Sequence, residues 1–206
     1  MKQLNIKAFA AIAIVLTVGL WLLILLLAGL KLEATFVAFK QLPTVLTLEM
    51  FIWGFFAKWG WQLRIFQGWL VPYPLIQGTW RGTLSSTWID PETNQPPMPI
   101  PVILTVRQTF LSITCSLFTI ESESRSHSAS IHIDEESGDK KLVYTYTNRP
   151  RTIVRDRSPI HDGTVSLKIF GDPPNELRGE YWTSRKSTGE IAVTFSSKSL
   201  ANKFDD

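Results

Sequence analysis

Residues 8–30 form an uninterrupted apolar run without a charged side chain. A helix of this length exceeds the roughly 20 residues needed to cross the hydrocarbon core of a bilayer. A cleaved signal peptide would have a shorter apolar region, about 7 to 15 residues, ending at a small-x-small site. The sequence around its end, "LLLAGLKLEATF", offers only a poor site of that kind, and no cysteine follows closely for lipidation. We therefore expect a transmembrane helix over about residues 8–30.

A second apolar segment, "TFVAFKQLPTVLTLEMFIWGFFA", covers about residues 35–57 and is interrupted by Lys40, Pro43 and Glu49. We predict a second membrane helix here, so that residues 1–70 make a two-helix transmembrane region with an interfacial linker. Basic residues prefer the cytoplasmic side of a membrane. This tendency places both chain termini in the cytoplasm, together with Lys2, Lys7, Lys58 and Arg64.

Glu49 places a carboxylate at membrane depth. Such residues are rare in membrane helices and usually face a partner helix or a water-filled space. Two interpretations stay open: a role in self-association or membrane disruption, and a neutral, protonated acid or a pair with Lys40 in a shallower helix. Aromatic residues of the kind that rest among lipid headgroups follow along the chain at Trp53, Trp59, Trp61 and Trp69.

The charge of the chain is divided unevenly. The whole chain carries +3, but residues 1–70 contain six basic and two acidic residues, which leaves −1 for the remainder. The positive excess lies beside apolar segments, where basic residues set membrane orientation. We therefore expect no nucleic-acid polymer as a partner. Cys115 is the only cysteine, so no intramolecular disulfide forms, and we expect it to be a small buried residue.

After the two prolines of "VPYP" at residues 71–74, the pattern changes from helical apolar runs to alternation with period two. Turn sequences such as "DPETNQPPMP", "EESGD", "GDPPN" and "STGE" separate the segments. Strands are predicted at residues 79–88, 102–108, 111–118, 119–133 (bent or broken), 141–147, 164–170, 177–185 and 191–196. Residues 149–163 are expected to form a charged loop.

Short strands without intervening helices favour a sandwich or an antiparallel barrel. A meander of eight strands closes on itself and leaves no exposed edge. We predict a membrane-anchored all-β protein, in which residues 72–206 form a lipocalin-like, eight-stranded antiparallel up-and-down barrel that senses a ligand in the cytoplasm.

Alternate residues of a strand face opposite sides, so each predicted strand divides into two faces. A purely structural barrel fills its interior with aliphatic side chains, because an unpaired polar group in a dry core costs about 1–3 kcal/mol. Here polar and aromatic residues share the inward faces, which predicts a cavity for a polar ligand. A register displaced by one residue would move them to the surface. The predicted ligand-binding residues are Ser86, Trp88, Ser122, Ser124, Tyr144, Asn148, Tyr181, Thr183 and Arg185.

Arg185 suits phosphate and also stacks on flat rings, while Tyr144, Tyr181 and Trp88 can stack on bases. The sequence contains no phosphate-binding Gly-rich loop, no paired metal-ligand motif and no Gly-x-Ser-x-Gly elbow. The histidines are scattered, and we interpret His161 with Asp162 as part of a solvated turn. We expect no enzymatic activity, no catalytic residue, no metal and no cofactor.

The motifs "GTWRGTLSSTW", "LVYTYTNRP" and "LRGEYWTSRKSTGEI" follow the two apolar segments. Together they resemble the bacterial CD-NTase-associated, two-transmembrane β-barrel effectors of cyclic-oligonucleotide-based antiphage signalling (CBASS). The similarity covers essentially the whole chain in architecture. Its more specific parts are the Tyr-x-Tyr-x-Asn-x-Pro and Gly-x-Tyr-x-Thr-x-Arg strands, whereas Gly-x-Trp also opens lipid carriers.

The resemblance implies an effector that is not an enzyme. A cyclic dinucleotide from a partner CD-NTase synthase would enter the barrel, the protein would form a homo-oligomer, and the bacterial inner membrane would be disrupted. By motif match, the pocket would include Tyr144, Asn148, Tyr181, Thr183 and Arg185. Two alternatives stay open: a membrane-tethered, lipocalin-like carrier of an apolar molecule, and a structural membrane protein whose barrel binds another protein through outward aromatics such as Trp182.

Overall fold

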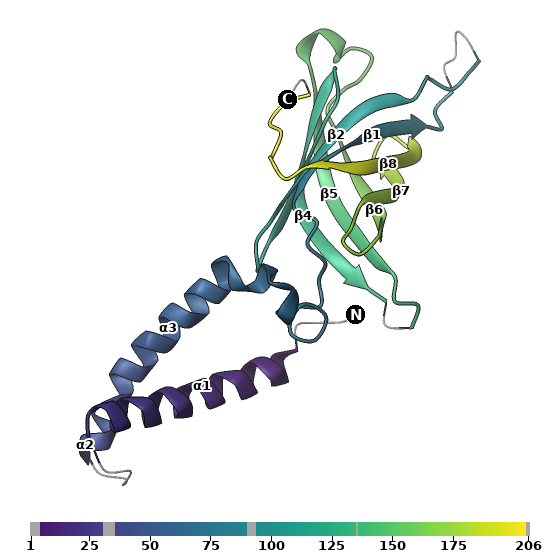
Figure 1. The fold of residues 1–206 in the computed structure, drawn as a ribbon. Helices are drawn as coiled ribbons and strands as arrows, with labels where there is room; N and C mark the ends of the chain where they lie inside the picture. Colours follow the sequence, from purple (N-terminus) through teal and green to yellow (C-terminus); the bar gives the residue numbers. More distant parts are fainter. Residues whose placement is uncertain (1–4, 31–35, 90–93, 135, 205–206) are drawn as a thin grey trace. The chain divides into compact units, whose positions relative to one another are not determined.

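The computed structural model describes residues 5–30, 36–89, 94–134 and 136–204. The chain divides into two compact units, with the boundary between Pro72 and Tyr73. The first unit is helical and the second is a β-barrel (Figure 1).

The helical unit contains α1 (Ile6–Leu27), α2 (Phe36–Phe39), α3 (Leu42–Lys58) and two 3-10 turns, η1 (Gly60–Gln62) and η2 (Arg64–Phe66). Asn5 caps α1, since its side chain accepts a hydrogen bond from the Ala8 amide at 3.1 Å. Pro43 lies in the first turn of α3, where a missing amide hydrogen costs little. The predicted interruption is therefore a helix start. Both α1 and the stretch Phe36–Lys58 are long and apolar enough to cross a membrane.

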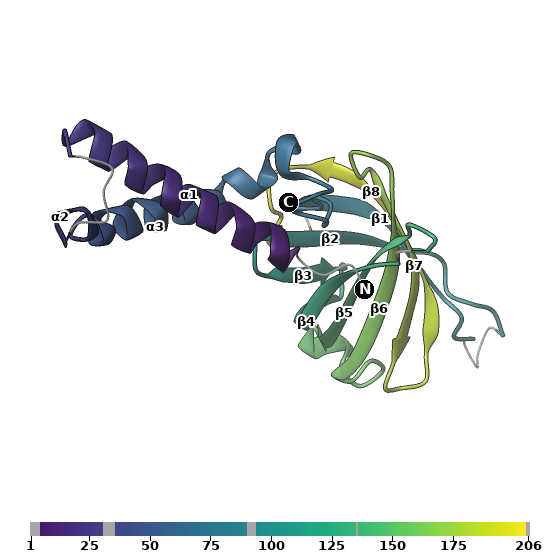
Figure 2. The same ribbon diagram turned by 90° about the horizontal axis from the view of Figure 1, so that it is seen from below.

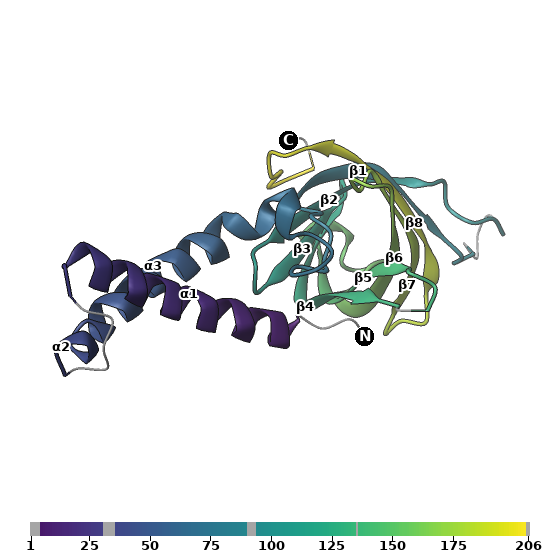
Figure 3. The ribbon, with the colours of Figure 1, turned by 60° about the horizontal axis from the view of Figure 1, so that its bottom comes forward.

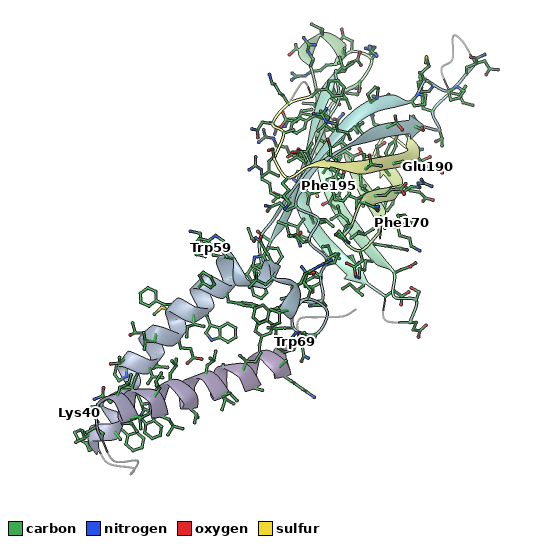
Figure 4. All side chains as sticks on the ribbon, in the orientation of Figure 1. Lys40, Trp59, Trp69, Phe170, Glu190 and Phe195 are labelled. Carbon is green, nitrogen blue, oxygen red and sulfur yellow. The ribbon has the colours of Figure 1, made fainter. Side chains whose placement is uncertain are left out.

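Helices α1 and α3 run antiparallel and contact each other (Figure 1, Figure 2). The Phe9 ring lies 5.7 Å from the Trp53 ring and 5.9 Å from the Phe56 ring, measured between centroids. Lys40 lies where α2 bends into α3, and Trp59 and Trp69 lie at the other end of the unit (Figure 4). The unit thus has an aromatic end beyond the last turn of α3.

Glu49 is buried between the two helices of this hairpin. Its Oε2 lies 2.6 Å from the Thr17 hydroxyl on α1, and its Oε1 accepts a hydrogen bond from Trp53 Nε1 at 3.2 Å. The Lys40 ammonium lies over the Phe36 ring, and no ion pair joins it to Glu49 within the described residues. A carboxylate at this depth was expected to face a partner helix or a water-filled space. The structure shows that Glu49 faces a partner helix, α1 of the same chain.

The second unit is a closed barrel in which every strand pairs antiparallel with its sequence neighbours and β1 pairs with β8. Figure 3 shows the strands following one another around it in chain order. This confirms the predicted eight-stranded up-and-down barrel. The strands are β1 (Gly78–Ser86), β2 (Ile100–Gln108), β3 (Ile113–Phe118), β4 (Ser122–Ile133), β5 (Lys140–Pro150), β6 (His161–Phe170), β7 (Glu176–Thr183) and β8 (Thr188–Ser197).

Inward and outward residues alternate along the strands as the pattern predicted. In β5, Leu142, Tyr144, Tyr146 and Asn148 are buried, and the residues between them are more exposed. In strand β4, a bulge between Ser126 and Ser128 shifts the pairing with β5 by one residue. Even-numbered serines face inward before the bulge, and odd-numbered residues such as Ile131 face inward after it. The expected bend in this strand is that bulge.

The two ends of the barrel differ. One end carries the β1–β2, β3–β4, β5–β6 and β7–β8 connections. At the other end, the segment that leads into β1 packs against the core: Ile76 is buried, and its amide donates to Gln108 Oε1 at 2.8 Å. The Trp80 indole donates to the Ile76 carbonyl at 3.0 Å. This end of the barrel is therefore filled by apolar side chains such as Ile76 and Trp80.

Candidate ligand-binding site

A cavity of about 730 Å³ lies inside the end of the barrel that carries the β1–β2, β3–β4, β5–β6 and β7–β8 connections. This volume is within the range of small-molecule sites, about 300–1,000 Å³. Its lower wall includes Leu84, Leu117, Val165 and Ile191, and its upper wall and rim are richer in hydroxyl, amide and guanidinium groups. The cavity therefore offers an apolar floor and a mouth where polar groups stand beside apolar residues such as Pro97, Pro99 and Ile120.

The structure places all nine predicted ligand-binding residues around this one cavity. They lie on or just after four strands, β1, β4, β5 and β7, so the fold brings together positions up to about a hundred residues apart in the sequence. Contact of each with a ligand stays a prediction. The nine residues are Ser86, Trp88, Ser122, Ser124, Tyr144, Asn148, Tyr181, Thr183 and Arg185.

Two of the nine occupy the rim instead of the strand positions expected for them. Strand β1 ends at Ser86, so Trp88 follows it and is 50% exposed. Strand β7 ends at Thr183, so Arg185 lies in the turn before β8, where its Nη1 donates to the Ser158 hydroxyl at 3.3 Å. Both predicted strands were two residues too long, and Arg185 is at the mouth of the cavity.

A row of three polar side chains crosses adjacent strands inside the barrel. Ser124 of β4 pairs with Asn148 of β5, and Asn148 pairs with His161 of β6. The Ser124 hydroxyl donates to Asn148 Oδ1 at 3.0 Å. Since this bond occupies the amide oxygen, the Asn148 NH₂ group is the part of the amide left to donate to a ligand.

The interpretation of His161 as a solvated turn residue is wrong. His161 begins β6, is buried, and lines the cavity. Its Nδ1 lies 2.9 Å from the Pro159 carbonyl oxygen, and burial, with Arg185 nearby, lowers the pKa of the ring. The alternation His161, Gly163, Val165 would have revealed the longer strand, but the turn-forming pair Asp162-Gly163 masked it.

Three tyrosines form an aromatic layer below the polar row. Burial raises the pKa of all three hydroxyls, to about 12 for Tyr146, and Tyr181 also shares a hydrogen bond with Ser86 that partly offsets this effect. The Tyr144 hydroxyl is fully enclosed and has no partner among the described residues. A polar group buried in this way points to a ligand or a water as its partner. Tyr146 shares the inward face but was not among the predicted site residues.

Arginines stand around the mouth. Arg157, in the connection between β5 and β6, pairs with Glu121 of the β3–β4 connection, and both line the cavity beside Arg185. The expected charged loop at residues 149–163 is shorter than predicted, because β5 continues to Pro150 and a 3-10 turn (η3, Thr152–Val154) follows. This arrangement can hold an anion at the mouth and flat rings below it.

Cys115 is buried as expected, and burial raises the pKa of its thiol far above the usual value, so it stays a neutral thiol. Within residues 5–30, 36–89, 94–134 and 136–204, no group of three or more His, Cys, Asp or Glu side chains is placed to hold a metal ion.

Two comparisons bear on these features. A family model described as "Cap15, cyclic dinucleotide receptor domain" matches residues 71–194, which are most of the barrel. A curated relative, CD-NTase-associated protein 15 from Staphylococcus schleiferi, is 38% identical over 92 residues, which cover 45% of this chain and 48% of the relative. The match thus spans about half the length of that relative. The family match, which the resemblance of the three barrel motifs anticipated, shows that the chain belongs to the Cap15 cyclic dinucleotide receptor family.

Proposed function

We propose that the barrel is a receptor for a cyclic dinucleotide made by a cognate CD-NTase synthase, and that the chain is an effector of antiphage defence and not an enzyme. The observation that carries the proposal is the cavity itself, which combines an aromatic layer with arginines at its mouth in a domain of this family. The activity that we propose for the whole protein extends beyond the matched domain.

The aromatic and arginine side chains of the cavity suit the chemistry of a cyclic dinucleotide. The molecule has two phosphates and two bases. Phosphates prefer planar guanidinium groups, and bases stack on aromatic rings. Arg157 and Arg185 stand at the mouth, and Tyr146 and Tyr181 lie below them. We therefore place the phosphates at the mouth and at least one base deeper, next to the row formed by Ser124, Asn148 and His161.

The helical unit supplies the effector part of the proposal. The two apolar helices would anchor the chain in the bacterial inner membrane, with the barrel and both termini in the cytoplasm. Ligand binding would then favour a homo-oligomer that disrupts the membrane. A ligand shifts such an equilibrium only if it binds the assembled form more tightly than the single chain.

Glu49 is the residue of the helical unit that we connect with assembly. Its contacts with Thr17 and Trp53 hold α1 against α3 within one chain. A polar group inside a membrane hairpin can exchange such a partner for the same group of a neighbouring chain at little cost. We propose that this exchange contributes to oligomerisation.

A second candidate function rests on the lower wall of the cavity. Leu84, Leu117, Val165 and Ile191 would suit the tail of a lipid, as in a lipocalin-like carrier. The enclosed Tyr144 hydroxyl, the Asn148 NH₂ group and His161 Nε2 would then be unpaired against an apolar ligand, which costs free energy. The carrier is therefore the less favoured function.

The test uses the full chain in detergent micelles or nanodiscs. Calorimetry against a panel of cyclic dinucleotides should show binding of at least one member, and Arg185→Ala and Tyr181→Ala should weaken it. Ser85→Ala, an exposed position of β1, is the control and should bind as the wild type does. No binding across the panel, together with uptake of a fluorescent fatty acid, would favour the carrier.

A further inference from the structure

The hydrogen bond between His161 and Pro159 fixes which ring nitrogen carries the proton. A carbonyl oxygen can only accept, so the Nδ1 atom, 2.9 Å from the Pro159 oxygen, must be the donor. In a neutral imidazole the other nitrogen, Nε2, is then a bare acceptor. The assignment follows from the partner that the backbone provides.

The surroundings of His161 favour the neutral ring. Burial lowers its pKa, Arg185 adds to that effect, and neighbouring Asp162 opposes it. Tyr146 and Tyr181, which line the same cavity, have raised pKa values and are neutral at physiological pH. The remaining charged groups of the cavity, Arg157 and Glu121, pair with each other. At neutral pH the cavity therefore contains an uncharged histidine.

The Nε2 atom of His161 has no protein partner within the described part of the chain, and the ring lines the cavity. Asn148 lies directly opposite His161 in the β5–β6 pairing, with its amide oxygen already bonded to Ser124. The two residues thus present an acceptor and an NH₂ donor side by side. A phosphate has only acceptor oxygens and matches half of this pair, whereas the edge of a nucleobase has an N–H donor next to an acceptor.

We propose that His161 and Asn148 read the edge of one base of the ligand: His161 Nε2 accepts a hydrogen bond from a base N–H, and the Asn148 NH₂ donates to the adjacent acceptor. This assignment rests on the proposed function and deepens it. It makes His161 a specificity-determining residue and leaves the phosphates to Arg157 and Arg185. The class of ligand is then one whose deeper base keeps a free N–H on that edge.

Two substitutions of His161 distinguish recognition of the base edge from a purely structural role. In His161→Asn, the shorter amide can keep the bond to the Pro159 carbonyl but has no atom at the Nε2 position. In His161→Gln, the longer amide can present an acceptor at the Nε2 position. The probes are cyclic di-AMP, cyclic di-GMP and cyclic di-UMP, titrated into the full chain in nanodiscs. We expect His161→Asn to bind the tightest probe about 10- to 100-fold more weakly, as expected for one buried hydrogen bond, and His161→Gln to lose less.

The pH profile gives a second readout that does not depend on a variant. Protonation turns Nε2 from an acceptor into a donor, so wild-type affinity should fall only below about pH 6.5, where the folded ring with its lowered pKa takes up a proton, and His161→Gln should lack this decrease. An affinity that instead rises on acidification in the wild type alone would show a histidine that binds phosphate, and would overturn the assignment. Unchanged binding by His161→Asn would also overturn the assignment. So would equal losses of affinity in His161→Asn and His161→Gln if both variants keep the wild-type unfolding temperature. A wild-type chain that binds no probe contradicts the proposed function itself, and the assignment with it.

Discussion

Tyr146 lies directly opposite Gly163 in the β5–β6 pairing, and its side chain covers the glycine: a Cβ built on Gly163 would stand 2.5 Å from the Tyr146 hydroxyl oxygen. The Trp182 carbonyl oxygen, at 2.8 Å from the same point, closes the other side. The glycine thus makes the space in which one ring of the aromatic layer lies. Gly189 has the same relation to Tyr181, whose ring would be 2.6 Å from the added atom.

Gly163→Ala should therefore displace the Tyr146 ring and destabilise the barrel by about 1–3 kcal/mol, the usual cost of overpacking. Thermal unfolding of the full chain in detergent measures the change, and ligand titration should show weaker binding. Ser85→Ala, on the outside of β1, should stay within about 0.5 kcal/mol of the wild type. Equal stability of the two variants would mean that the ring moves aside freely.

The buried tyrosines predict an unusual alkaline titration. Ultraviolet absorbance of the folded chain should show tyrosine ionisation well above the ordinary pKa of 10, with a component near pH 12 that Tyr146→Phe removes. The sign for stability follows, because the unfolded chain loses these protons first. Stability should thus decrease as the pH rises above about 10. Ordinary ionisation of every tyrosine near pH 10 in the folded chain would contradict the buried layer.

The lowered pKa of His161 predicts a change of stability on the acid side. The unfolded chain takes up this proton first as the pH falls through about 6.5, while the folded ring stays neutral. The stabilisation is fully present above that pH and decreases below it. His161→Gln should therefore unfold with a smaller dependence of its midpoint on pH between 7.5 and 5.5. Identical slopes for the two proteins would place His161 in solvent.

Glu49→Leu should insert into membranes normally but assemble less and permeabilise less, because it removes the contacts with Thr17 and Trp53. Glu49→Gln is the matched control, since an amide can keep both hydrogen bonds and should retain most of the effect. Chemical crosslinking and dye release from loaded vesicles, each with the activating ligand, measure the two outcomes. A crosslinking pattern and dye release that Glu49→Leu leaves unchanged would separate this residue from assembly.

The inward faces were predictable because side chains in a barrel strand alternate regularly outside bulges such as the one between Ser126 and Ser128 in β4. Ser86, Ser124, Tyr144, Asn148 and Tyr181 therefore came from the sequence by parity and motif, and the structure brings them together around one cavity. The ends of the strands were not predictable in the same way. Turn-forming residues such as Gly163 also occur within strands where another side chain needs space, and here that side chain is Tyr146.

The rim required long-range information. Arg157 and Ser158 reach the cavity through the path of the β5–β6 connection, so their positions do not follow from strand parity. Arg185 was predicted from parity and motif, but it reaches the cavity from the turn before β8 and not from a strand. Hydrophobicity located the two apolar helices. It did not determine that Glu49 would pair with Thr17, because that contact depends on how α1 and α3 pack.

The central claim is that the barrel binds a cyclic dinucleotide in the cavity framed by Arg185, Tyr181 and His161. Isothermal titration calorimetry of the full chain in nanodiscs, against cyclic dinucleotides and against their linear dinucleotides, tests it most directly. We predict saturable binding of at least one cyclic ligand, weakened at least tenfold in Arg185→Ala, which corresponds to a loss of about 1.4 kcal/mol. Absence of binding by every cyclic ligand, or binding that Arg185→Ala and Tyr181→Ala leave unchanged, would contradict the claim.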